Sequence, residues 1–356
     1  MYEAAAVLHR PPHILPPKTG TFIQYVADNA DIIHIKGIIK IITPKSSVTA
    51  EEPILRTNIL PSVQHFAEKA HVLIQVYQTD VVVGYSKIAV QDFDYKSNTP
   101  TSLLKKVDML WLYGKWKNLL LPGWNVYIEH LTSNIINFSE SRILFLPFIH
   151  QPASNYNTIY TTLLCALEDA KRYGHDYCII TFDQPLYAKA REIVSAAPEG
   201  SELSKIIVRL GGFHLLMSFF GAIGYIMQGS GIKEVLSLIY VPNSLEKMLN
   251  GHAYARAVRA HTLLHLTLAT VISKELLLDS EMDENITNTI ELVTNKTISY
   301  NDIEEGDEIA EALLYQFNEK LQEHGERGPS AKLWIQYFHM VSIAKQFIRA
   351  ERMGDW

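Results

Sequence analysis

The clearest pattern of apolar and polar positions lies in the middle third of the chain. Four apolar runs there have the length and composition of buried strands: 142–150, 176–182, 205–210 and 232–240. Stretches with helical apolar spacing separate them: 155–173, 184–196 and 213–228. Strands joined by helices form right-handed crossovers, so this region predicts an α/β fold with a largely parallel sheet and flanking helices, such as a doubly wound fold.

The flanking regions carry different patterns. Residues 30–95 are rich in branched apolar residues and predict at least three strands, including 72–78 and 81–90. Residues 105–121 predict a helix, whereas 124–131 fit a short strand or a short helix equally well. Beyond the middle third, apolar spacing predicts four helices: 243–250, 253–277, 309–324 and 331–352. Between them, residues 279–308 are polar and predict a loosely structured excursion, with a hairpin or a short helix as the alternative forms.

These patterns divide the chain into consecutive regions. A Pro-rich lead-in covers residues 1–20, a β-rich N-terminal region 21–135 and an α/β core 136–275. An acidic segment and C-terminal helices follow in 276–356. The apolar stripe of the last predicted helix continues nearly to the end of the chain. It fits either an ordinary C-terminal helix or a fragment of a longer protein.

Composition narrows the class of protein. The chain has 356 residues, of which 47% are hydrophobic and 20% charged, as in ordinary globular proteins. Its two cysteines form neither a disulfide framework nor a zinc motif, and its N-terminus lacks the pattern of a secretory signal. The longest apolar stretch, 215–227, is shorter than the ~18–20 residues of a membrane span. We therefore expect an intracellular protein, in nucleus or cytoplasm, with no membrane partner.

Charge is distributed unevenly around the net value of −6. Residues 276–326 hold 14 acidic and 2 basic residues, whereas residues 1–120 hold 13 basic and 10 acidic ones. The chain is thus mildly basic outside one acidic segment, which neither excludes nor specifically predicts a nucleic-acid partner. The Pro-rich lead-in and the acidic segment are candidate contacts for protein partners.

Candidate chemistry gathers where the predicted strands end, because ligands of parallel sheets bind at the carboxyl edge. Asp183 and Gln184 follow the second strand, and Asp183 fits either a helix N-cap or a carboxylate that binds metal or acts as a base. His150 ends the first strand. Asp92 and Asp94 alternate in a strand-like segment and could supply further carboxylates for Mg²⁺ or Mn²⁺, or merely form a polar strand face.

The third strand is followed by Gly211, Gly212, Phe213 and His214. The two glycines suit a left-handed turn, or the close approach of a phosphate or metal ligand. His214 would open a helix, where the neutral imidazole is favoured; it fits a catalytic hydrogen-bonding residue or a satisfied, half-buried side chain.

Two other segments carry weaker patterns. Arg256 and Arg259 share one helical face with His252, and they suit phosphate or carboxylate binding or ordinary salt bridges. His261 and His265 are spaced as HxxxH but lack the glutamate of the zinc-protease motif. The basic and aromatic segment 105–117 fits a single-strand stacking surface or a helix with its aromatics in the core.

The segments TFDQPLYAKAREIV, IIVRLGGFHLLMSFF and MLNGHAYARAVRAH resemble a set of uncharacterised animal proteins associated with transposable elements. The resemblance covers residues 140–275 best. A more distant resemblance is to transposon-derived proteins with GDQ and GDFH at two strand ends. It implies an RNase-H-like core whose motif positions are Asp183-Gln184 and Gly211–His214. This chain has Gly212 where that pattern has an acid.

Three hypotheses follow from these features. The first is a transposable-element-derived protein with an RNase-H-like core that binds DNA and metal and catalyses phosphoryl transfer, or a degenerate or fragmentary form of one. The second is a non-catalytic interaction scaffold descended from such a core. The third is a small-molecule α/β enzyme that uses His214 as its base.

Overall fold

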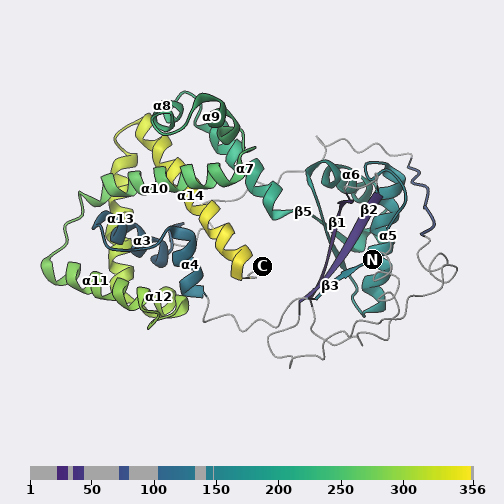
Figure 1. Cartoon of the computed structure of the whole chain (residues 1–356), viewed down its shortest axis with the longest axis horizontal. Coiled ribbons are helices and arrows are strands. Elements are labelled where there is room, and N and C mark those ends of the chain that lie inside the picture. Colours follow the sequence, from purple (N-terminus) through teal and green to yellow (C-terminus); the bar gives the residue numbers. More distant parts are fainter. Residues whose placement is uncertain are drawn as a thin grey trace. The chain divides into compact units, whose positions relative to one another are not determined.

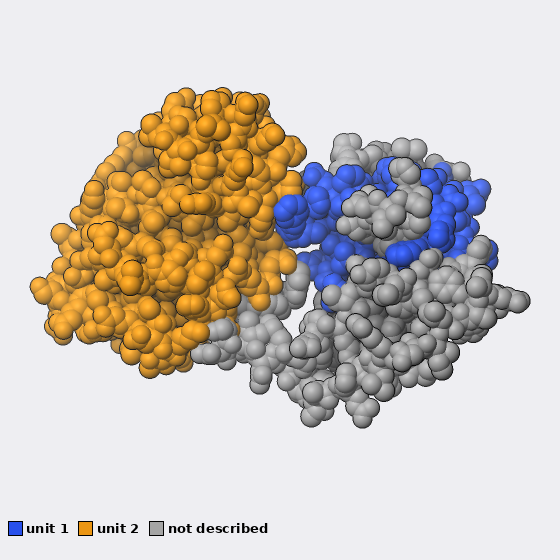
Figure 2. Space-filling model, in the orientation of Figure 1, with its two compact units in different colours: residues 1–91, 137–214 blue, residues 92–136, 215–356 orange. Residues whose placement is uncertain are grey.

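The structure is a computed structural model, and it describes residues 22–30, 35–43, 72–79, 103–132, 142–146 and 148–353. The chain forms two compact units, each built from two separate stretches of sequence (Figure 2). Unit 1 comprises residues 1–91 and 137–214, and unit 2 comprises residues 92–136 and 215–356. The sequence patterns had suggested consecutive regions instead. The Pro-rich lead-in and the predicted strand 81–90 lie outside the described residues.

Unit 1 is built on a five-stranded sheet with the order β3-β2-β1-β4-β5 (Figure 1). Its strands are β1 (Phe22–Ala30), β2 (Ile35–Thr43), β3 (Arg142–Phe145), β4 (Cys178–Phe182) and β5 (Ile206–Leu210). β1, β4 and β5 are parallel neighbours, whereas β2 is antiparallel to both β1 and β3. Only β2 therefore runs against the others, which confirms the α/β class.

In the described part of unit 1, the helical segments that accompany this sheet are α5 (Tyr156–Arg172), α6 (Gln184–Ser195) and the 3₁₀ turn η2 (Glu202–Lys205). α5 begins at Asn155, whose side chain accepts a hydrogen bond from the Asn157 amide, and Gly174 follows its end with a φ of 76°. Sheet and helices share one apolar core that includes Tyr25, Ile159 and Phe182.

Residues 72–79 also belong to unit 1, and the strand predicted at 72–78 is wrong. The amide of Gln75 donates to Thr161 Oγ1 at 2.9 Å, and that of Tyr77 donates to Asn157 Oδ1 at 2.8 Å. Side chains of α5 thus take the place of a neighbouring strand as hydrogen-bond partners.

Unit 2 is helical throughout its described residues. Its helices are α3 (Lys106–Trp116), α4 (Trp124–Thr132), most of α7 (Gly212–Ile226), α8 (Ile232–Ser237), α9 (Pro242–Leu249), α10 (Tyr254–Ser273), α11 (Ser280–Thr294), α12 (Tyr300–Gly306), α13 (Glu308–Gly325) and α14 (Pro329–Met353). The chain passes from unit 1 to unit 2 within α7. The segment 124–131, which fitted strand or helix, is the helix α4.

α3 lies in the centre of unit 2 and is buried from Val107 to Gly114. Trp111 and Tyr113 are among its buried side chains, and they pack with α4, α11 and α13 in one apolar cluster. Trp111 and Tyr113 therefore belong to the core, and the partly buried Trp116 packs against it, which favours the helix with core aromatics over a single-strand stacking surface.

One expectation for unit 2 was wrong, and another was met only in its helical alternative. The predicted strand 232–240 is the short helix α8, in which Ile232 and Leu236 are buried at a spacing of four residues while Leu238 and Ile239 are exposed. The predicted loose excursion 279–308 forms the helices α11 and α12. Asp279 caps α11 through the Met282 amide at 2.8 Å, and Ser299 forms a capping box at α12.

Apolar helices raise the question of membrane insertion. Within the described part of the chain, no helix combines the length and hydropathy that a bilayer crossing requires.

Candidate functional site

The candidate site of unit 1 begins with Asp183, which directly follows β4. It is the N-cap of α6, and its Oδ1 accepts a hydrogen bond from the Leu186 amide at 3.2 Å. Pro185 stands in the first turn, where its missing amide costs nothing. The predicted capping role is therefore confirmed. A carboxylate has about four acceptor positions on two oxygens, so this single bond leaves capacity for a ligand.

Gly211 lies beside the end of β4. Its amide donates to the Phe182 carbonyl at 2.9 Å, and a Cβ at Gly211 would lie 3.5 Å from the same oxygen. Neither Gly211 nor Gly212 has a positive φ, so the expected left-handed turn is wrong. Gly212 is instead the first residue of α7. β5 is therefore followed almost directly by α7, with only Gly211 between the two elements.

His214 is the third residue of α7 and is half-buried. Its ring stands edge-on to that of Phe213, with 5.4 Å between the ring centroids, and the Phe213 side chain is 54% exposed. Among the described residues, no hydrogen-bond or ion-pair partner is found for the His214 side chain. It remains a candidate for contact with a ligand.

The sheet register adds a residue that the sequence analysis missed. Ala27 of β1 pairs with Phe182 of β4, and Phe182 pairs with Leu210 of β5. One residue further along each strand come Asp28, Asp183 and Gly211. We call these three positions the carboxyl-edge row. Two of its three residues are aspartates on neighbouring parallel strands.

The sequence does contain a pattern that could have revealed Asp28. Ile23, Tyr25 and Ala27 are buried in the sheet and alternate with Gln24 and Val26, which are only half-buried. Gln24, Asp28 and Asn29 make this stretch less apolar than the run 35–43 that follows it, so the apolar pattern points to the later run.

The other predicted site residues are dispersed. His150 is exposed in unit 1, and Gln184 is exposed at the start of α6. Arg256 and Arg259 are exposed on α10, which belongs to unit 2. Asp92 and Asp94 lie outside the described residues. Within the described part of the chain, no group of three or more His, Cys, Asp or Glu side chains is arranged to hold a metal ion.

The HxxxH pair of α10 is structural. His261 Nδ1 lies 2.8 Å from the Tyr337 hydroxyl, and His265 Nε2 lies 3.0 Å from Ser342 Oγ. Burial lowers the pKa of His261 to about 4, so the ring is neutral near pH 7. Each histidine is thus a core residue that faces its own hydroxyl partner, although His265 Nδ1 has no hydrogen-bond partner among the described residues. The zinc alternative finds no support.

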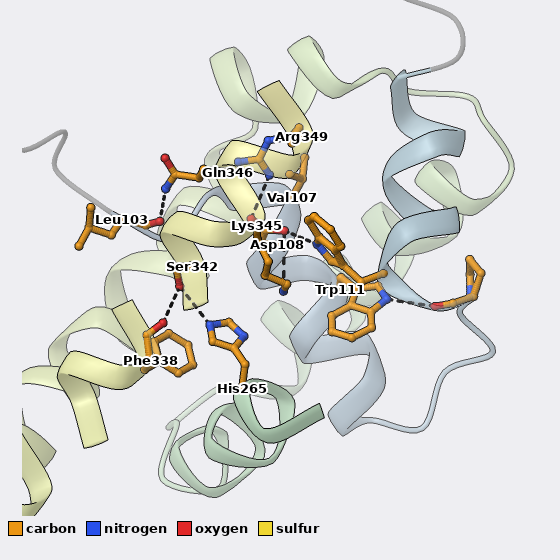
Figure 3. Close-up of polar contacts among 12 residues, drawn as sticks. Leu103, Val107, Asp108, Trp111, His265, Phe338, Ser342, Lys345, Gln346 and Arg349 are labelled. Atoms are coloured by element: carbon orange, nitrogen blue, oxygen red, sulfur yellow. Dashed lines mark hydrogen bonds and ion pairs between the residues drawn. The ribbon is translucent and has the colours of Figure 1, made fainter. Parts of the chain in front are cut away.

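A second polar cluster lies in the core of unit 2 and was not predicted (Figure 3). Asp108, Lys345 and Arg349 are each at most 3% exposed. Arg349 Nη1 donates to Asp108 Oδ2 at 3.0 Å, and Trp124 Nε1 donates to Asp108 Oδ1 at 2.6 Å. Burial alone would raise the pKa of Asp108, but the nearby cations and these hydrogen bonds lower it. Asp108 is therefore an ionised carboxylate.

Lys345 is the weakly bound member of this cluster. Its Nζ lies 4.0 Å from Asp108 Oδ1 and has no hydrogen-bond partner among the residues that the structure describes. It lies over the rings of Trp111 and Trp124, at 4.9 Å and 5.1 Å from their centroids. Burial lowers the pKa of Lys345 to about 8, with Asp108 opposing the shift and Arg349 adding to it.

The fold and these sites define a protein with an α/β sheet unit and a helical unit. Comparison with protein families matches residues 123–356 to a family described as a domain of unknown function, DUF8702. The chain belongs to this family, and the match extends from α4 through β3–β5 to the last helix. Searches of curated proteins and of solved structures found no match.

Proposed function

We propose that unit 1 is an RNase-H-like core of transposable-element origin that binds Mg²⁺ or Mn²⁺ and acts on DNA by phosphoryl transfer. The observation that carries the proposal is the carboxyl-edge row, in which Asp28 and Asp183 occupy adjacent positions on parallel strands. The parallel neighbours β1, β4 and β5 support the proposal, because ligands of parallel sheets bind where the strands end.

The residues of the row suit a hard divalent cation. Mg²⁺ and Mn²⁺ prefer oxygen ligands and are commonly held by one or two carboxylates together with substrate phosphates. A metal bound there would neutralise charge that develops on a phosphate during displacement. Asp183 would hold the metal, and the register places Asp28 beside it on the neighbouring strand as the second aspartate position. Gly211, which has no side chain, follows the next strand in the same row. His214 would orient the substrate as a hydrogen-bonding residue.

Calorimetric titration of the full chain with Mn²⁺ tests this site. Asp183→Asn is the informative variant, because asparagine caps a helix as well as aspartate does while removing the charge. We expect Asp183→Asn and Asp28→Asn each to weaken Mn²⁺ binding at least tenfold. Asp176→Asn is the matched control, since Asp176 is exposed at the opposite end of β4. Nicking of labelled DNA by the wild type, lost in the same two variants, would complete the case.

A non-catalytic interaction scaffold is the second candidate. The cap formed by Asp183 and the absence of a three-carboxylate group among the described residues favour it. Gly212, which stands where the resemblance places an acid, also favours it. A folded wild type that takes up no Mn²⁺ at millimolar concentrations would rule out the metal site and leave the scaffold as the better account.

A further inference from the structure

The consecutive helices α9 and α10 of unit 2 (Figure 1) carry exposed basic side chains. Arg256 and Arg259 lie one turn apart near the start of α10, and Lys247 lies on α9. His252 stands in the connection between the two helices, so it is not on the α10 face that the sequence suggested. All four side chains are exposed. We call these four residues the basic face.

The position of Arg256 is fixed by the fold. Its Nη1 donates to Ser244 Oγ at 3.0 Å, which ties the start of α10 to α9. Ser244 and Lys247 are three residues apart on α9, so they share a side of that helix. A guanidinium has five N–H donors, and this bond uses one of them. Arg256 is thus held in place with most of its donors still available.

The basic face is not neutralised by the protein. Other exposed cations of this chain pair with carboxylates, as Lys117 does with Asp283 and Arg327 does with Glu275. No such ion pair joins the basic face to any carboxylate of the described residues, although Glu246 is exposed nearby on α9. α10 itself contains no acidic residue. Surface arginines are usually either solvated or paired in salt bridges. Among the described residues, the arginines of the basic face form no salt bridge.

We propose that the basic face binds the phosphate backbone of double-stranded DNA. Arg256 and Arg259 are separated by a rise of about 4.5 Å along α10, at ~1.5 Å per residue. Two long side chains one turn apart can reach neighbouring phosphates of one DNA strand, whose charges follow each other every ~3.4 Å of helix axis. Arginine is the side chain best suited to bidentate phosphate contacts. The choice of DNA rests on the proposed function, whereas the phosphate chemistry rests on the basic face alone.

Fluorescence anisotropy with a labelled 20-base-pair duplex, in EDTA so that metal plays no part, tests the proposal. The variant Arg256→Gln/Arg259→Gln removes two cations from the basic face. Lys274→Gln/Lys332→Gln is the matched control, because both lysines are exposed in unit 2, away from the basic face, and the loss of charge is equal. Asp183→Asn is included to separate this surface from the metal site.

Two lost phosphate contacts should lower the slope of log affinity against log salt by about 1.8. Between 50 and 200 mM salt the arginine variant should therefore lose about 12-fold less affinity than the wild type. The lysine control and Asp183→Asn should keep the wild-type slope. If Asp183→Asn binds DNA as the wild type does, the result supports the basic face. If the same variant also binds metal as well as the wild type does, the metal proposal fails although the basic face stands.

Several results would overturn the proposal. One is a wild type that does not bind the duplex at 50 mM salt. Another is an arginine variant with the same slope as the lysine control. A third is competition by polyglutamate as effective, charge for charge, as competition by unlabelled duplex, which would assign the basic face to an acidic protein partner.

Discussion

Replacing Lys345 with methionine should stabilise unit 2 at neutral pH. The ammonium group is buried between Trp111 and Trp124 with no hydrogen-bond partner, and Asp108 is 4.0 Å away. Methionine fills a similar volume and carries no charge to desolvate. Removing one member of a buried ion pair usually destabilises a protein, because the other charge loses its partner. Here the Asp108 carboxylate keeps its hydrogen-bonded partner Arg349.

The size of the effect follows from the shifted pKa. The value for Lys345 falls from 10.5 to about 8, and each pKa unit corresponds to about 1.4 kcal/mol. The protonated lysine therefore costs the native state about 3 kcal/mol relative to its neutral form. Loss of the attraction to the two indole rings offsets about 1 kcal/mol of this. We expect Lys345→Met to raise the free energy of unfolding by about 2 kcal/mol at pH 7.

The gain should depend on pH in a definite direction. Because the native pKa lies below the unfolded one, the native state binds fewer protons between pH 8 and 10.5. The free energy of unfolding of the wild type therefore rises across this window, because the penalty for burying the protonated Lys345 disappears. The advantage of Lys345→Met should shrink accordingly as the pH increases from about 8 to about 10.5.

Urea unfolding followed by tryptophan fluorescence is a suitable assay, because all five tryptophans belong to unit 2. Lys332→Met, an exposed substitution on the same helix, is the control and should change stability by less than about 0.5 kcal/mol. Arg349→Met should cost about 3–5 kcal/mol, because it removes the 3.0 Å partner of a buried carboxylate. A loss of more than about 1 kcal/mol in Lys345→Met at pH 7 would refute the reasoning.

Three further predictions concern other parts of the fold. Asp183→Ala should cost about 1 kcal/mol through the lost cap while Asp183→Asn is neutral, as thermal melts of unit 1 would show. Gly224→Ala should destabilise unit 2 by more than about 2 kcal/mol in urea titrations, because its Cβ would lie 2.0 Å from the Leu249 carbonyl, whereas Gly306→Ala meets nothing within 4 Å. The pKa of His261, lowered from 6.5 to about 4, makes the native state lose about 2 kcal/mol between pH 7 and 5, and His261→Gln should remove that part of the acid sensitivity.

Sequence patterns predicted those elements whose signal is local. The runs 142–150, 176–182 and 205–210 contain β3, β4 and β5, because strands covered on both faces are continuously apolar. The same reasoning failed at 232–240, where an equally apolar run forms α8 and leaves Leu238 85% exposed. Apolarity alone does not separate a buried strand from a short helix, and only packing decided between them.

The buried cluster of unit 2 illustrates a different limit. Asp108 and Arg349 are separated by 241 residues, and nothing local distinguishes them from surface charges. Lys345 and Arg349 lie one turn apart on α14, within a stripe that is otherwise apolar. A charged pair inside an apolar stripe predicts a buried partner of opposite charge, but the sequence does not say which carboxylate that is.

The register of the sheet changes how the glycine at position 212 is interpreted. The sequence resemblance suggested that this glycine removes the second carboxylate of a metal site. In the structure Gly212 lies beyond the carboxyl-edge row, in the first turn of α7, whereas the row itself contains Asp28 and Asp183. The proposed metal site therefore does not need an acid at position 212, because the row already holds two aspartate positions. Mn²⁺ binding by Asp28→Asn therefore distinguishes an intact two-aspartate site, where binding weakens, from a degenerate core, where nothing changes. Asp183→Asn, which preserves the helix cap, should weaken binding in the same way if the site is intact.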